Sequence, residues 1–136
     1  MAAGYSKKSL VEKLGIKDGF TISIVGAPRN YATTLGELPS GVKQRKKLEG
    51  PFDFLQFFCS KRSRLEDNFP TLKEALSPSG MLWVSWPKGS SGVPTDLTEN
   101  VVREIGLRNG LVDVKVCAID ATWSGLKFVF RLKDRK

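Results

Sequence analysis

Ten residues that could bind a ligand lie near the ends of the expected strands. Cations, hydroxyls and indole rings recur among them, and this combination suits a small anionic or aromatic ligand. In the competing interpretation, the tryptophans pack the edge of a sheet and Asp120 binds the amides of its own turn. The residue types alone favour this second interpretation. The candidates are Gly26, Arg29, Tyr31, Ser60, Lys61, Trp86, Lys88, Asp120, Thr122 and Trp123.

Nucleophilic and metal-dependent catalysis lack their usual residues. The chain has no histidine, and its two cysteines, Cys59 and Cys117, do not have the spacing of zinc ligands. Cys59 ends an apolar, strand-like run, and only Lys61 is near enough in sequence to lower its pKa, so a buried structural thiol is expected. The sequence therefore predicts no catalytic residue, no metal site and no cofactor.

The formal charge of +8 favours contact with anions. Basic side chains gather in runs at residues 43–47, 61–64 and 131–136. Lysine and arginine hold phosphates without reading sequence, and the 43–47 run has no aromatic side chain on which bases could stack. A nonspecific nucleic-acid or polyanion binder is therefore an alternative function, and we expect at most weak binding that is lost near physiological salt.

The length of 136 residues suits one domain, residues 1–136, with a single apolar core. The longest mainly apolar runs, at residues 52–59 and 81–86, are too short to cross a bilayer. The first residues lack the charged flank and apolar stretch of a secretory signal. We therefore expect a cytoplasmic protein with no membrane partner.

Alternating helical and strand-like patterns predict a mostly parallel sheet with helices on both faces. Capping boxes at Ser9–Glu12 and Asp96–Glu99 are expected to begin helices, and Pro70 is expected to kink another. Only six residues separate the last two strands, too few for a crossover, so the final strand should run antiparallel beside residues 81–86. The predicted fold is a small Rossmann-like α/β sheet of about five strands, at residues 20–25, 52–59, 81–86, 111–119 and 126–132.

Several segments resemble known families. Residues 14–19 and 76–84, with the predicted strand order, are similar to S-adenosylmethionine-dependent methyltransferases. More closely, and over nearly the whole chain, the sequence resembles the bacterial domain-of-unknown-function family 3052, above all at residues 83–88 and 122–127. The resemblance implies a trimmed methyltransferase-like scaffold with no established activity.

The same resemblance implies how a cofactor-binding member would hold S-adenosylmethionine, and this sequence departs from that pattern. Such members follow their first strand with several glycines and place a carboxylate after the second strand, where it binds the ribose. Here the turn is Gly26-Ala27-Pro28-Arg29, and residues 27–51 are too few for the missing strand–helix units. We therefore expect no useful binding of this cofactor.

The first functional expectation is a non-catalytic binding or interaction module that takes a small anionic ligand or a protein partner. A minimal methyltransferase acting at the strand-end cleft is a further alternative.

Overall fold

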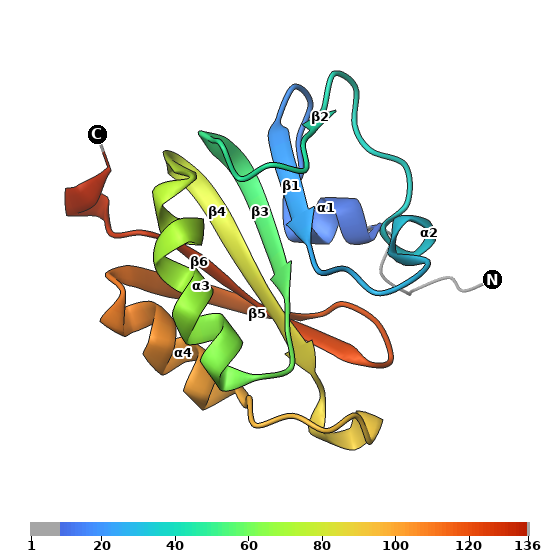
Figure 1. Cartoon of the computed structure of the whole chain (residues 1–136). Helices are drawn as coiled ribbons and strands as arrows, with labels where there is room; N and C mark the ends of the chain where they lie inside the picture. Colours follow the sequence, from blue (N-terminus) through green and yellow to red (C-terminus); the bar gives the residue numbers. More distant parts are fainter. Residues whose placement is uncertain (1–8, 136) are drawn as a thin grey trace.

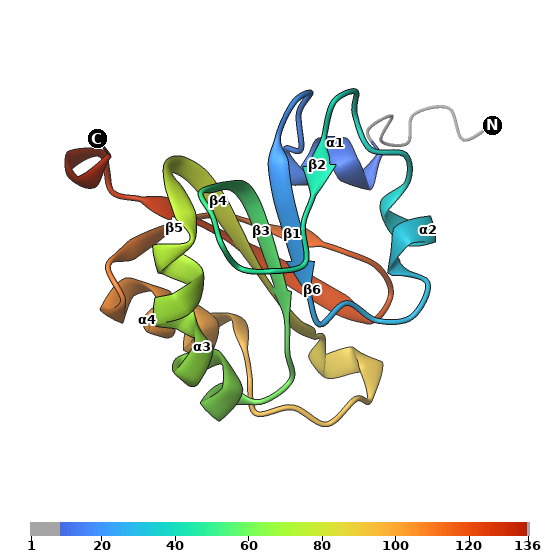
Figure 2. The same cartoon turned by 45° about the horizontal axis from the view of Figure 1, so that its top comes forward.

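The computed structural model describes residues 9–135, and six strands form one sheet within them in the order β2-β1-β3-β4-β6-β5 (Figures 1 and 2). No helix in this part of the chain is long and apolar enough to cross a membrane. The strands are β1 (Thr21–Val25), β2 (Lys43–Gln44), β3 (Phe52–Phe58), β4 (Leu76–Pro87), β5 (Leu111–Ala118) and β6 (Trp123–Phe130). The helices are α1 (Leu10–Leu14), α2 (Tyr31–Leu35), α3 (Arg62–Glu74) and α4 (Glu99–Arg108), with short 3-10 turns η1 (Gly89–Ser91) and η2 (Leu132–Asp134).

The strand directions confirm the predicted fold class. Strands β1 to β4 are mutually parallel, and β6 runs antiparallel between β4 and β5. Pairing of β6 with β4 extends from Met81–Val129 to Pro87–Trp123. The sheet has one strand more than the five expected, because the two residues of β2 lie beside the start of β1.

Helices cover both faces of the sheet, so the layers are also as predicted (Figure 1). One buried cluster lies between the sheet and helices α3 and α4, where the rings of Phe69 and Phe128 meet edge to face at 5.7 Å. A second cluster lies under α1 and α2 and contains Trp83. The indole Nε1 of Trp83 donates a hydrogen bond to the carbonyl of Leu14 at 2.9 Å, which fixes the end of α1 on the sheet.

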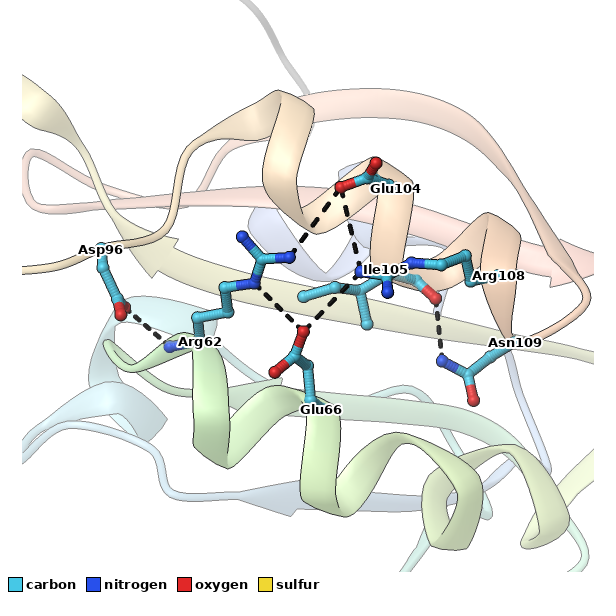
Figure 3. Close-up of polar contacts among 7 residues, drawn as sticks. All are labelled: Arg62, Glu66, Asp96, Glu104, Ile105, Arg108 and Asn109. Atoms are coloured by element: carbon cyan, nitrogen blue, oxygen red, sulfur yellow. Dashed lines mark hydrogen bonds and ion pairs between the residues drawn. The ribbon is translucent and has the colours of Figure 1, made fainter.

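Of the two predicted capping boxes, one is confirmed and the other is wrong. Ser9 and Glu12 form the predicted capping box of α1. At α4 the cap is Thr98, whose side chain accepts from the N–H of Val101, so the predicted Asp96–Glu99 box is wrong. The carboxylate of Asp96 instead accepts from the N–H of Arg62 at 2.7 Å (Figure 3). Because the preceding residue gives α3 no side-chain cap, Asp96 satisfies an amide at the start of that helix.

Four charged side chains join the outer surfaces of α3 and α4 (Figure 3). Glu66 lies 3.1 Å from Arg62 and 3.7 Å from Arg108, and Glu104 completes the group at 4.0 and 3.8 Å from the same two arginines. All four are well exposed, so each pair contributes only about 0–1 kcal/mol. The group therefore contributes little to the stability of the fold.

The course of α3 and the bounds of β4 and β6 differ from the expectations, and β6 spans Trp123–Phe130 where a strand was predicted at 126–132. Helix α3 continues unbroken past Pro70, where a kink or restart was predicted. Strand β4 begins at Leu76, before the predicted start at Met81, and its pairing with β3 shifts register between Phe52 and Phe54. Gly80 allows this irregularity, because a Cβ there would lie 2.6 Å from the carbonyl oxygen of Phe52.

Replacing Gly106 with alanine should destabilise the fold, although alanine favours a helix over glycine by about 1 kcal/mol. Gly106 is buried in α4, and a Cβ there would overlap the ring of Phe128. Overpacking of this kind costs about 1–3 kcal/mol. Denaturant unfolding should show the loss for Gly106→Ala and little change for Gly89→Ala, where a Cβ meets nothing within 4 Å. Equal stability of the two variants would contradict the packing described here.

Candidate functional site

A cavity of about 340 Å³ lies beside the carboxyl-terminal half of β1. Strand β2 pairs only with Thr21 and Ile22, whereas β1 continues to Val25 (Figure 1). The cavity thus occupies the place into which a longer β2 would extend. Its volume falls within the range of small-molecule sites. It is lined by Ile24, Ala27, Pro28, Asn30, Tyr31, Ala32, Leu35, Gly36, Leu38 and Gln44.

The wall of the cavity offers backbone hydrogen-bonding groups from β1. The carbonyl of Ile22 accepts from the N–H of Arg45 at 2.9 Å, so the polar groups of Ile22 point toward β2. Backbone directions alternate along a strand, and those of Ile24 therefore point the same way, beyond the end of β2. No strand residue pairs with Ile24 on that side. The donor and the acceptor of Ile24 are consequently left without a partner in β2, and both Ile24 and Gln44 line the cavity.

A buried chain of hydrogen bonds connects the cavity to the centre of the sheet. The hydroxyl of Tyr31 donates to Oε1 of Gln56 at 2.7 Å, and Nε2 of Gln56 donates to Oγ of Ser85 at 3.1 Å. Gln56 and Ser85 are fully buried. Burial raises the pKa of Tyr31 above its ordinary value, and the negative charge of Asp120 adds to this. Tyr31 therefore stays neutral and anchors α2 to β3 and β4.

Aromatic rings extend this anchor to the β5–β6 hairpin. The ring of Phe58 meets Tyr31 at 4.8 Å and Trp123 at 5.1 Å, both edge to face. In the hairpin loop, Oδ1 of Asp120 accepts from the N–H groups of Thr122 and Trp123, each at 2.8 Å. Asp120 thus binds its own turn, as in the competing interpretation of the sequence.

Other predicted site residues are dispersed. Trp86 is buried in the core under α3 and α4, on the other side of the sheet from Tyr31. The carbonyl of Ser60 accepts from Oγ1 of Thr95, and the N–H of Lys88 donates to the carbonyl of Thr122. Gly26 has φ 73°, and a Cβ there would lie 2.8 Å from the carbonyl oxygen of Phe58. The two remaining candidates, Arg29 and Lys61, have exposed side chains.

Of the ten predicted residues, Tyr31 alone lines the cavity. The sequence analysis missed Ile24, Leu35, Leu38 and Gln44, which supply most of the apolar wall and one amide. Gln44 lies inside the basic run at residues 43–47, and its strand-like position depends on pairing with β1. A two-residue strand leaves no periodic signal, so nothing in the local sequence identifies these residues.

Thiol alkylation should separate the two cysteines. Cys59 is buried, and that burial raises the pKa of its thiol to about 11, partly opposed by Arg64. The thiolate is the reactive form, so Cys59 should resist iodoacetamide at pH 8, while the partly exposed Cys117 is modified first. Mass spectrometry of the intact protein would show one adduct, which Cys117→Ser should abolish. Modification of Cys59 at an equal rate would refute its inert role.

Replacing Tyr31 with phenylalanine should lower the free energy of unfolding by about 1–3 kcal/mol, because Oε1 of Gln56 would remain buried without a donor. The double variant Tyr31→Phe/Gln56→Leu should cost less than the sum of the two single changes, since both partners are then apolar. Chemical denaturation of the four proteins forms the test. Strict additivity would mean that the two side chains are not coupled.

Comparisons with known proteins rest on structure. No protein-family model matches the sequence, and no curated protein matches it. A SAM-dependent methyltransferase from Aquifex aeolicus aligns with a TM-score of 0.62 at 16% identity, over 88% of this chain and 86% of the other. A precorrin-6y C5,15-methyltransferase from Geobacter metallireducens gives 0.59 at 11% identity, over 94% of both chains. Magnesium protoporphyrin IX methyltransferase from Synechocystis with bound SAH gives 0.54 at 11% identity, over 90% and 78%.

These neighbours correct the first functional expectation. A non-catalytic interaction module was expected because the turn after β1 and the second strand looked too reduced for an enzyme. Methyltransferases instead align over most of their own length as well as most of this chain, so the argument that the scaffold is too reduced for an enzyme is wrong. At such low identity the likeness establishes the architecture: the chain has the fold of S-adenosylmethionine-dependent methyltransferases.

Proposed function

We propose that this protein is a methyltransferase-like enzyme whose ligand binds in the cavity beside β1. The observation that carries the proposal is the position of this cavity, next to the carboxyl end of the first strand in a sheet of this fold. Open α/β sheets bind ligands outside the carboxyl ends of their parallel strands. The Synechocystis neighbour holds SAH, so S-adenosylmethionine is the methyl donor to test.

The cavity residues fit an adenosine-containing donor through neutral groups. Ile24, Leu35 and Leu38 offer apolar surface for a base, and the amide of Gln44 can donate to and accept from ribose hydroxyls. Among the described residues no carboxylate lines the cavity, and Arg45 follows β2. Gln44 would therefore do the work of the carboxylate found in cofactor-binding members. S-adenosylmethionine, once bound, supplies an activated methyl group.

The chain's own groups restrict the acceptor. Within residues 9–135, Tyr31 is the one titratable side chain lining the cavity, and it is neutral and already donates to Gln56. It is therefore a poor general base. We infer that the methyl acceptor is a nucleophile that does not need a residue of the cavity wall to remove its proton. The role left to Tyr31 is positional, because it fixes the wall that α2 contributes.

Calorimetric titration with S-adenosylmethionine and S-adenosylhomocysteine tests this function. We expect saturable binding that Ala32→Trp weakens at least about tenfold, equivalent to about 1.4 kcal/mol, because the indole would fill the cavity. Thr33→Trp is the matched control, since Thr33 is an exposed neighbour on α2 that does not line the cavity. Absence of binding at millimolar concentration, or equal binding by both variants, would refute the proposal.

Two further assignments depend on residue types. We infer membership in the domain-of-unknown-function family 3052 from residues 83–88 and 122–127, and a cytoplasmic location from the two free cysteines. The first of these segments ends β4 and the second begins β6, which pair with each other. The most specific part of the resemblance thus coincides with the inserted antiparallel strand.

A further inference from the structure

Two lysines face each other across neighbouring strands. Lys127 of β6 is the cross-strand partner of Lys115 of β5, and its other neighbour is the buried Trp83 of β4. Like charges placed directly opposite in a sheet destabilise it. A lysine on an edge strand such as β5 protects that edge from aggregation, but β6 is an interior strand and needs no such protection. Edge protection therefore accounts for Lys115 and not for Lys127.

A third lysine reaches the same region from the loop after α1. The carbonyl of Leu14 accepts from Nε1 of Trp83, and a Cβ on Gly15 would lie 3.4 Å from the sulfur of Met81. The loop therefore packs on β4 beside the position of Lys127. Lys17 follows two residues after Gly15, with its side chain exposed. The positive charges of Lys115 and Lys17 both act on Lys127 and, after burial, lower its pKa.

Acidic partners are missing from this cluster. Within residues 9–135, none of the three lysines takes part in an ion pair. Asp113 of β5 is held by Arg103 of α4 at 2.9 Å. Asp18 is adjacent to Lys17 in sequence, is exposed, and does not raise the pKa of Lys127. Three neighbouring cations, one of them half-buried, thus lack a counter-charge within the described part of the chain.

We propose that Lys17, Lys115 and Lys127 form a binding site for a phosphate group. Three ammonium groups on separate elements suit a tetrahedral dianion, and lysine binds phosphate as a point charge. Bound phosphate would offset the like-charge contact between β5 and β6. None of the three residues lines the cavity beside β1, so this site is independent of the proposed methyltransferase function.

Thermal unfolding at matched ionic strength tests the site. Saturating pyrophosphate should raise the midpoint of the wild-type protein by about 3–6 °C relative to sodium chloride, as ligand linkage predicts for a tenfold excess over the dissociation constant. Lys127→Met should unfold at an equal or higher temperature than wild type without pyrophosphate, because a destabilising charge is gone, and should lose the pyrophosphate effect. Lys133→Met, which removes the charge of another exposed lysine, should keep it.

Lys115→Met provides a second variant whose exposed side chain can be changed without disturbing the core, and it should also lose the pyrophosphate effect. A wild-type midpoint that does not respond to pyrophosphate would overturn the proposal. An equal response in all variants would also overturn it and would indicate general charge screening. Repeating the titration with a short oligonucleotide distinguishes a small phosphorylated ligand from a nucleic-acid backbone. In either case the response must depend on Lys127.

Discussion

Strand β4 pairs with two strands that run in opposite directions, and the rest of the structure depends on this arrangement. On one side β4 pairs parallel with β3, and on the other it pairs antiparallel with β6. Trp83 lies at the centre of this strand, fully buried, and its indole N–H binds the end of α1. Gly125, opposite Ser85, leaves room for the indole, because a Cβ there would lie 3.1 Å from the Trp83 ring. The parallel half, the hairpin and the first helix are therefore assembled around one side chain.

The two-residue strand β2 is the feature on which the proposed ligand site depends. The sequence expectation counted the residues between the first two strands and concluded that the ligand-binding part was deleted. The chain instead retains two residues of a strand beside β1, and the unfilled remainder becomes a cavity lined by Ile24, Gln44 and α2. Residues Ile24 and Gln44 therefore border this space, and no carboxylate of the described residues lines it. The proposed ligand site depends on these neutral groups.

The charges are divided between the two faces of the molecule. Helices α3 and α4 carry arginines that are matched by glutamates, and Arg103 holds Asp113. Lys17, Lys115 and Lys127 have no such partners in the described residues. The formal charge of +8 is therefore not spread evenly, and its unmatched part includes one half-buried lysine. Charge runs in the sequence, at residues 43–47 and 131–136, do not indicate this cluster, because its members are far apart in the chain.

Local patterns in the sequence were sufficient for the architecture and for the start of α1. Apolar runs predicted β1, β3, β4, β5 and β6, the short last connection required an antiparallel end strand, and Ser9 with Glu12 determined the start of α1. These features depend on neighbours within a few residues or on connection length. The tertiary structure alone decided that Asp96 caps α3 rather than α4, that Trp86 lies in the core away from Tyr31, and that Gln44 and Ile24 share a cavity. Each of these contacts joins residues far apart in the chain, and strand pairing, which no local periodicity encodes, brings them together.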